Sequence, residues 1–201
     1  MVARQVVSRG VRDPRVIAAI EEVPREIFVP DPSRGRAYQD RPLPIGCGQT
    51  ISQPYMVAFM VEALELRGND RVLEIGAGSG YAVAVLAEIV REVFAVERIQ
   101  ELVDKATITL REAGYGHVHI KHADGTEGWL DEAPFDAILV SASAKAIPAA
   151  LKAQLQIGGR LVVPVGKPGK EQHLMRVRRL SEESFAEEDL GEVHFVPLIS
   201  T

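Results

Sequence analysis

The chain is poor in cysteine, in basic charge and in long apolar runs, and each shortage excludes a class of protein. Its single cysteine, Cys47, excludes an intrachain disulfide and a cysteine zinc cluster. With 28 acidic against 23 basic residues, the net charge of −5 gives no general attraction to nucleic acid. No run reaches the apolar length of a membrane span, and residues 1–10 lack the apolar core of a signal peptide. We therefore expect no nucleic-acid partner, no membrane association and a cytoplasmic location.

The stretch VLEIGAGSGY, residues 72–81, joins an apolar run to a helical pattern through three alternating glycines. It predicts a strand, a tight turn and a helix start, in which bare backbone faces a ligand. The dinucleotide pattern G-x-G-x-x-G requires glycine at position 81, where Tyr81 stands. The spacing E-x-G-x-G-x-G is better known from S-adenosylmethionine sites. A glycine turn without any ligand is the alternative.

From residue 71 onward, strand and helix patterns alternate regularly. Strands are predicted over 71–75, 92–96, 117–120, 135–140 and 160–165, and helices over 81–90, 99–113 and 148–155. This alternation predicts an α/β fold with a doubly wound, mostly parallel sheet and helices on both faces. Two further strand-like segments, 172–180 and 192–198, are joined by an acidic connection and predict a closing antiparallel hairpin.

The N-terminal part reads as a helical cap on this sheet. Asp13 and Pro14 predict a helix start, and the helix is expected to end near Val23. The irregular segment 24–44 follows, with Phe28 and Tyr38 as expected anchors into the core.

A second helical pattern begins after Ser52, which makes Ser52 the natural N-cap. The positive end of a helix is also a place where a ligand carboxylate is stabilised, so a capping and a binding role can coexist.

Carboxylates stand at the ends of predicted strands, where an open α/β sheet binds its ligand. Glu74 ends the first strand, and Glu97 ends the second about 20 residues later, the offset of a ribose-binding acid. A surface glutamate that only ends a strand is the alternative for Glu97. Asp124 and Gly125 follow the third strand, and an adenine contact and an ordinary Asp-Gly turn both remain open.

Other polar residues carry weaker signals. The histidines, His117, His119 and His122, have no cysteine beside them and are expected to be solvated, so we predict no metal site. Cys47 is expected to be a buried or incidental thiol. The basic residues of the tail are expected to form the exposed side of an edge strand: Arg176, Arg178 and Arg179. The segment SASA, residues 141–144, lacks the Asn/Asp-Pro-Pro-aromatic motif of methylases that act on base amines.

These segments together resemble the bacterial protein-L-isoaspartate O-methyltransferases. The resemblance spans roughly residues 14–198, and its most specific parts are QTIS, residues 49–52, and FVPL, residues 195–198. The other segments that carry it are VPREIFV (23–29), LPIGCGQTISQPYMVA (43–58), VLEIGAGSGY (72–81), VER (96–98), DG (124–125), FDAI (135–138) and GGRLVVPVG (158–166). The sequence departs from the family at residues 141–144, where Thr-Ala-Ala-Pro is usual, and at Ala123, where glycine is usual.

The resemblance implies a single methyltransferase domain of the S-adenosylmethionine-dependent, Rossmann-like type, with a seven-stranded sheet. Residues 1–52 would form the cap and substrate segment, and residues 53–201 the cofactor-binding core. It implies methyl transfer from S-adenosyl-L-methionine, giving S-adenosyl-L-homocysteine, to isoaspartyl residues of damaged proteins by a monomeric enzyme, with D-aspartyl residues as a further candidate.

The residue roles implied by the resemblance fall into three groups. The active-site residue is Ser52. The cofactor residues are Thr50, Ile51, Glu74, Gly76, Ala77, Gly78, Ser79, Glu97, Arg98, Asp124 and Gly125. The substrate residues are Gln49, Thr50, Ile51, Ser52, Pro197 and Leu198, and an open groove is expected beside them. A methyltransferase of a small molecule or RNA, and an inactive cofactor-binding module, are the alternatives.

Overall fold

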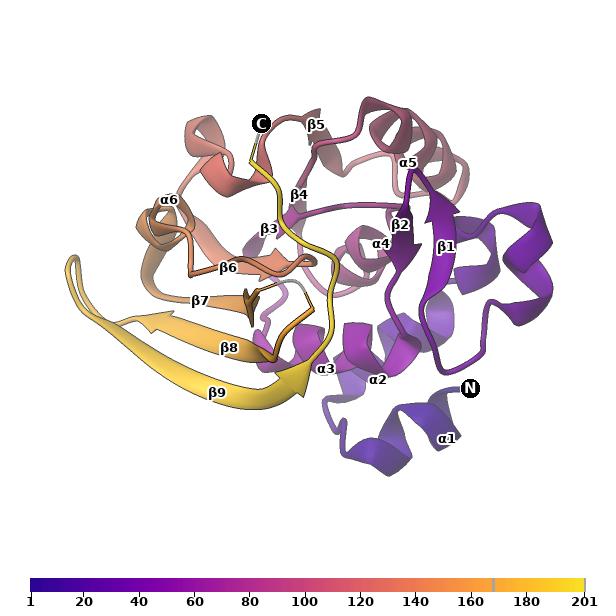
Figure 1. The fold of residues 1–201 in the computed structure, drawn as a ribbon, viewed down its shortest axis with the longest axis horizontal. Helices are drawn as coiled ribbons and strands as arrows, with labels where there is room; N and C mark the ends of the chain where they lie inside the picture. The colour runs from indigo at the N-terminus through magenta and orange to yellow at the C-terminus, as the bar shows by residue number, and fades with distance from the viewer. Residues whose placement is uncertain (168, 201) are drawn as a thin grey trace.

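A seven-stranded sheet organises the computed structural model, which describes residues 1–167 and 169–200 (Figure 1). The strand order is β5-β4-β3-β6-β7-β8-β9. The strands are β3 (Arg71–Ile75), β4 (Glu92–Glu97), β5 (His119–His122), β6 (Phe135–Val140), β7 (Leu155–Gly166), β8 (Gln172–Arg179) and β9 (Phe185–Val193). Strands β3 to β7 pair in parallel, whereas β7 with β8 and β8 with β9 are antiparallel. The predicted doubly wound sheet with a C-terminal hairpin is confirmed.

Helices cover both faces of the sheet. The α-helices are α1 (Val2–Gln5), α2 (Pro14–Glu22), α3 (Pro54–Ala63), α4 (Tyr81–Ala87), α5 (Gln100–Glu112) and α6 (Ala149–Ala153). Side chains alternate along a strand, so Val72 packs with the helices of the N-terminal half, whereas Leu73 and Ile75 pack on the other face with Leu151 of α6. Short 3-10 turns complete the chain: η1 (Val7–Arg9), η2 (Arg25–Phe28), η3 (Asp31–Arg36), η4 (Gly125–Glu127) and η5 (Leu130–Glu132).

The strand order reverses between β3 and β6. The chain leaves β3 on one side for β4 and β5, and then returns to place β6 on the other side of β3. Where the two strands end, the Ser141 amide donates to the Ile75 carbonyl at 2.8 Å. Ligands of open α/β sheets bind at such a reversal, beyond the carboxyl ends of the strands.

The N-terminal cap begins as predicted and differs further on. The Asp13 carboxylate accepts from the Arg15 amide at 2.8 Å and Pro14 opens α2, so the predicted helix start is confirmed. Phe28 is buried, as expected. Tyr38 is 43% exposed, and its predicted role as a core anchor is wrong. Its hydroxyl bonds to Glu26, which keeps the polar end of the ring at the surface.

The prediction that Ser52 caps α3 is wrong. The helix begins at Pro54, and the N-cap is Gln53, which makes no side-chain capping hydrogen bond. Proline suits the first helical position because it has no amide hydrogen and its φ is preset, so Pro54 moves the boundary one residue later. The Ser52 hydroxyl is consequently not committed to capping. The segment before it pairs in a small hairpin, β1 (Leu43–Gly46) with β2 (Gln49–Ile51), which the sequence did not predict.

The closing hairpin differs from its prediction in two respects. Strand β9 contains three of the five acidic residues that were expected to form a connection, Glu187, Glu188 and Asp189, and the chain after Val193 is a tail outside the named strands. Strand β8 lies inside the sheet, so the prediction of an edge strand for its arginines is wrong. Across the two strands Arg176 faces Glu188 and pairs with it, and opposite charges at facing positions contribute to the stability of a ladder.

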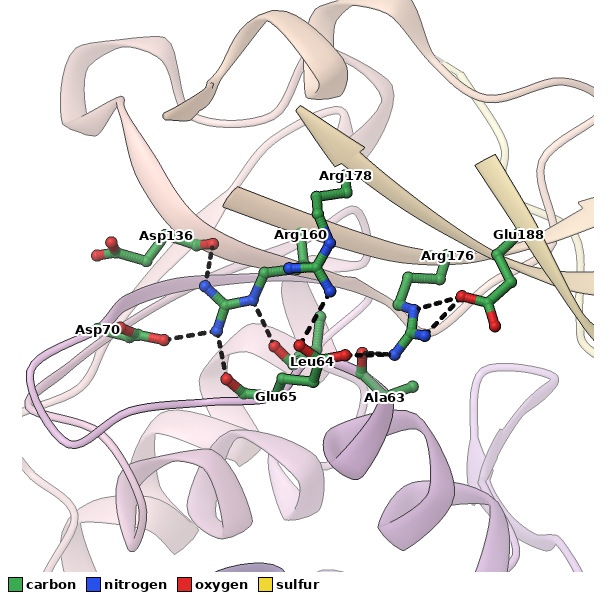
Figure 2. A network of polar contacts seen from close by, with 9 residues as sticks. All are labelled: Ala63, Leu64, Glu65, Asp70, Asp136, Arg160, Arg176, Arg178 and Glu188. Carbon is green, nitrogen blue, oxygen red and sulfur yellow. Dashed lines mark hydrogen bonds and ion pairs between the residues drawn. The ribbon is translucent and has the colours of Figure 1, made fainter. Parts of the chain in front are cut away.

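Arginines of β7 and β8 hold the C-terminal end of α3 (Figure 2). Arg160 donates to the carbonyls of Leu64 and Glu65 at 2.6 and 2.7 Å and pairs with Asp70 at 2.8 Å. Arg176 donates to the Ala63 carbonyl, and both Arg176 and Arg178 pair with the Glu65 carboxylate. The last carbonyls of a helix have no partner within it, and these guanidinium groups supply one.

Within residues 1–167 and 169–200, no helix combines the length and the apolarity that a membrane crossing requires. In the same part of the chain, no three side chains of His, Cys, Asp or Glu are grouped so that they could hold a metal. His119 and His122 lie exposed on β5.

Candidate active site

The glycine turn after β3 forms the floor of the candidate site. Gly76 donates from its amide to the Val96 carbonyl at 2.8 Å, which ties the turn to the end of β4. Gly78 and Gly80 have φ values of +55° and +88°, and a Cβ on Gly80 would lie 2.9 Å from Leu110. Only glycine combines this backbone with such close packing of α5. Ala77 and Ser79 lie in the same turn and line a pocket with Glu74.

Glu97 closes β4 with its carboxylate aimed back at the turn. One oxygen accepts from the Gly78 amide at 3.0 Å and the other from the Ile99 amide at 2.9 Å. The side chain is 7% exposed and lines a pocket with Gly78 and Arg98. Carboxylate oxygens accept more than one hydrogen bond each, so the fixed group retains acceptor capacity toward a ligand.

Glu74 is a buried carboxyl group with one oxygen satisfied. The Ser141 hydroxyl donates to Oε1 at 2.9 Å, whereas Oε2 is buried and accepts no hydrogen bond from the described residues. Burial raises the pKa of Glu74 to about 8; the nearby Glu97 charge adds to the rise, and the Ser141 hydrogen bond opposes it. An acid held in this way is suited to a cationic ligand group, which would pair with Oε2 and favour the ionised form.

Asp124 and Gly125 have different places in the structure. The Asp124 carboxylate accepts from the Thr126 amide and hydroxyl at 2.8 and 2.7 Å, as in an ordinary Asp-Gly turn. Gly125 lines the pocket that contains Glu97, and a Cβ there would lie 2.6 Å from Ile75. The structure thus brings the Gly125 backbone to the pocket, while Asp124 shapes the turn that carries it.

The segment QTIS lies between this pocket and an open groove. Two pockets border the glycine turn, one beside Glu97 and an inner pocket beside Glu74, and Thr50 and Ser141 line both of them and the groove. Ile51 is buried against the pocket floor and Gln49 lies at the pocket rim. Ser52 lines the inner pocket and the groove, whose volume is about 650 Å³. A group bound at Ser52 would therefore lie next to a ligand bound over the glycine turn.

The C-terminal tail forms the opposite wall. Ser143 donates from its amide to the Val196 carbonyl, and Leu198 donates to the Ser143 carbonyl, both at 2.8 Å. In Figure 1 the tail runs back across the sheet from the end of β9, on the side of the β1–β2 hairpin. Pro197 and Leu198 line the pocket beside Glu97, whereas the groove is walled by the preceding residues up to Val196.

Two residues of the site were not singled out from the sequence. For Ser141 the sequence indicated only a missing base-methylase motif and a departure from the family pattern, although its position directly after β6 was a usable signal. Arg25, which donates to the Ser52 carbonyl at 2.7 Å, lies in the segment VPREIFV, and no role was predicted for it. Cys47, expected to be buried or incidental, is exposed at the tip of the β1–β2 hairpin.

Comparison with protein families shows which family this chain belongs to. The family model described as protein-L-isoaspartate(D-aspartate) O-methyltransferase matches residues 1–201. The chain belongs to this family. A protein-L-isoaspartate O-methyltransferase of Rhodopseudomonas palustris is 58% identical over 99% of this chain and 91% of its own length. A relative of the same name from Marinobacter nauticus is 56% identical over the same shares of both chains.

Solved structures agree with this family assignment. A Plasmodium falciparum protein-L-isoaspartate O-methyltransferase, crystallised with S-adenosyl-L-homocysteine, superposes with a TM-score of 0.85 at 26% identity. The match covers 97% of this chain and 95% of that one. A second protein-L-isoaspartate O-methyltransferase superposes with a TM-score of 0.87 at 28% identity, and this chain spans 62% of its length and is covered to 95%.

Proposed function

We propose that this protein transfers a methyl group from S-adenosyl-L-methionine to the free α-carboxylate of L-isoaspartyl residues in damaged proteins, a modification that initiates repair. The observation that carries the proposal is the meeting of three cavities at Thr50 and Ser141. Two of them border the glycine turn, one beside Glu97 and one beside Glu74, and the third is an open groove beside Ser52. Membership of the family supports the same reaction.

The residues present fit the cofactor. Oε2 of Glu74, which has no hydrogen-bond partner among the described residues, is an acceptor for the α-ammonium group of the cofactor, and the glycine turn offers bare backbone next to it. Glu97, held by two amides, is an acceptor for ribose hydroxyls. Arg98 and Gly125 line the same pocket as Glu97 and border the space left for the rest of the cofactor. When bound, the cofactor supplies an electrophilic methyl group on a sulfonium.

The acceptor needs no general base. An α-carboxylate has a reference pKa of about 3.3–3.7 and is ionised at neutral pH, so the nucleophile is already formed. The work left to the protein is to place this carboxylate and to keep water away. We assign Ser52 the first task, with its hydroxyl donating to the carboxylate from the groove. Residues 192–196 wall the groove and are placed to contact the main chain of varied substrates. Gln49, Pro197 and Leu198 line the adjoining pocket beside Glu97, where we expect them to contact the substrate next to the cofactor.

The proposal also covers the domain organisation, the oligomeric state and the cellular compartment of the enzyme. Residues 1–52 act as cap and substrate segment and residues 53–201 as cofactor core of one domain. The acidic net charge favours a monomeric enzyme without a nucleic-acid partner, and the scarcity of cysteine favours a reducing compartment such as the cytoplasm.

Ser52→Ala should lower turnover on an isoaspartyl peptide about 10- to 100-fold, because a hydrogen bond to a charged group contributes about 1.5–3 kcal/mol. The cofactor Kd should change less than twofold, since Ser52 does not cap α3. Steady-state kinetics and calorimetry measure the two quantities. Ser8→Ala is a matched control, because its hydroxyl bonds to the Arg4 carbonyl away from the site. Parallel loss of turnover and cofactor affinity would instead indicate a structural role for Ser52.

Cofactor binding at pH 6.5 should release a proton from Glu74. At this pH a carboxyl with a pKa of about 8 is protonated, and an ammonium group beside it favours the ionised form. The cofactor's own amino group, with a reference pKa of about 7.7–8.0, stays protonated. Calorimetry in buffers of different ionisation enthalpy measures the release, which should approach one proton in the wild type and vanish in Glu74→Gln. Equal proton release by both proteins would contradict the assignment.

The proposed function is tested by combining a binding and a transfer measurement. Calorimetry with S-adenosyl-L-methionine reports binding, and a labelled-methyl assay on an isoaspartyl peptide reports transfer. We expect both. Binding without transfer to the peptide would favour an inactive cofactor-binding module and overturn the proposal.

A further inference from the structure

Arg25 is a fully buried arginine whose hydrogen bonds go to main-chain carbonyls. Its guanidinium has 0% exposure; Nε donates to the Ala37 carbonyl at 2.8 Å and Nη2 donates to the Ser52 carbonyl at 2.7 Å. Burial lowers the pKa of this guanidinium, as expected for a charge removed from water. Burying an ion costs several kcal/mol, so a side chain in this position needs a compensating role.

The guanidinium also lies against the cofactor side of the site. Its central carbon is 4.8 Å from the centroid of the Tyr81 ring, and Tyr81 opens α4 directly after the glycine turn. Tyr81 is itself buried and lines the inner pocket together with Ser52. One side chain thus joins three segments: the cap at Ala37, the acceptor segment at Ser52 and the start of the cofactor helix.

The bond to the Ser52 carbonyl acts on the orientation of the Ser52 residue. The following residues have little freedom, because Pro54 has a preset φ and restricts the conformation of Gln53. The peptide that joins Ser52 to Gln53 is the remaining link, and its carbonyl is the atom that Arg25 holds. Fixing that peptide fixes the direction in which the Ser52 side chain leaves the backbone.

We propose that Arg25 is a positioning residue for methyl transfer: by holding the Ser52 carbonyl, it aims the Ser52 hydroxyl at the acceptor carboxylate without contacting cofactor or substrate. This inference rests on the proposed function for the role of Ser52. Lysine cannot replace arginine here, because a single ammonium lacks the planar fork that reaches two carbonyls at once.

Two variants test the proposal, Arg25→Lys and Arg25→Gln. Both should lower kcat on an isoaspartyl peptide about 10- to 100-fold, the cost of a small misplacement in a reacting site. The calorimetric Kd for S-adenosyl-L-methionine should change less than twofold. Arg34→Lys is the matched control, since Arg34 lies on the same cap, exposed beside Asp31, and should leave both quantities unchanged. If a buried lysine prevents folding, the neutral Arg25→Gln carries the test.

Hydrogen exchange supplies a readout that does not depend on activity. In both variants the amides of residues 49–53 should exchange at least about tenfold faster, and those of β3 and the glycine turn should not change. Unchanged exchange at residues 49–53, or a cofactor Kd that rises in step with the loss of kcat, would overturn the proposal. A wild-type protein that does not methylate the peptide would overturn the proposed function instead, and the exchange measurement would still decide whether Arg25 positions Ser52.

Discussion

Arg160→Leu should lower the free energy of unfolding by about 3–5 kcal/mol, the cost of breaking one side of a buried ion pair. Arg160 is 6% exposed, and its guanidinium joins Asp70, the carbonyls of Leu64 and Glu65 directly after α3, and the Asp136 carbonyl (Figure 2). The substitution leaves the Asp70 carboxylate buried without its cation and the two carbonyls that follow α3 without this donor. The helix that follows Ser52 would thereby lose its anchor to the sheet.

Urea unfolding monitored by circular dichroism measures this loss. Arg178→Leu is the matched control, because Arg178 pairs only at the surface with Glu65 and should cost at most about 1 kcal/mol. Replacing Asp70 as well, in Arg160→Leu/Asp70→Leu, should recover part of the stability, since no unpaired charge then stays buried. A loss below about 1 kcal/mol for Arg160→Leu would show that the pair does not anchor α3.

Glu97→Ala should weaken binding of S-adenosyl-L-methionine at least about 100-fold. Two charge-assisted hydrogen bonds to ribose hydroxyls would be lost, each contributing about 1.5–3 kcal/mol. The substitution also removes the acceptor of the Gly78 and Ile99 amides, so the glycine turn loses the contact that fixes it to the end of β4. Glu97→Gln keeps one acceptor oxygen and should lose about tenfold.

Calorimetry with S-adenosyl-L-methionine measures the series. Glu101→Ala is the control, because Glu101 is exposed on the first turn of α5 and pairs with Lys105, so its loss should leave the Kd within twofold. A Kd for Glu97→Ala within twofold of the wild type would contradict the ribose assignment. A thermal unfolding scan of the free proteins separates a lost contact from a collapsed turn.

Local patterns predicted where the glycine turn and Glu97 lie in the fold. The glycine turn and the position of Glu97 follow from short-range spacing, because a parallel sheet places the carboxyl ends of successive strands at one edge. The helix start at Asp13 was also predictable, because helix capping depends on only a few neighbouring residues. The predicted helix start at Ser52 was wrong because two local preferences competed there: serine favours the N-cap position, and proline favours the first helical position. The preference of Pro54 determined where α3 begins.

The parts that could not be predicted depend on contacts between distant segments. Arg25 and the Ser52 carbonyl are far apart in sequence and meet only when the cap packs on the sheet. Ser141 acquires its role because β6 lies beside β3, which brings its hydroxyl to Glu74. The acidic strand β9 pairs along β8, where Arg176 faces Glu188, and the residue pattern of either strand alone does not reveal this pairing.

The most direct test of this account compares two peptides of the same sequence, one with an L-isoaspartyl residue and one with a normal aspartyl residue. Labelled methyl transfer from S-adenosyl-L-methionine should be rapid to the first and near background for the second, since only the isoaspartyl linkage leaves a free α-carboxylate within the chain. Similar rates on both peptides would contradict the account.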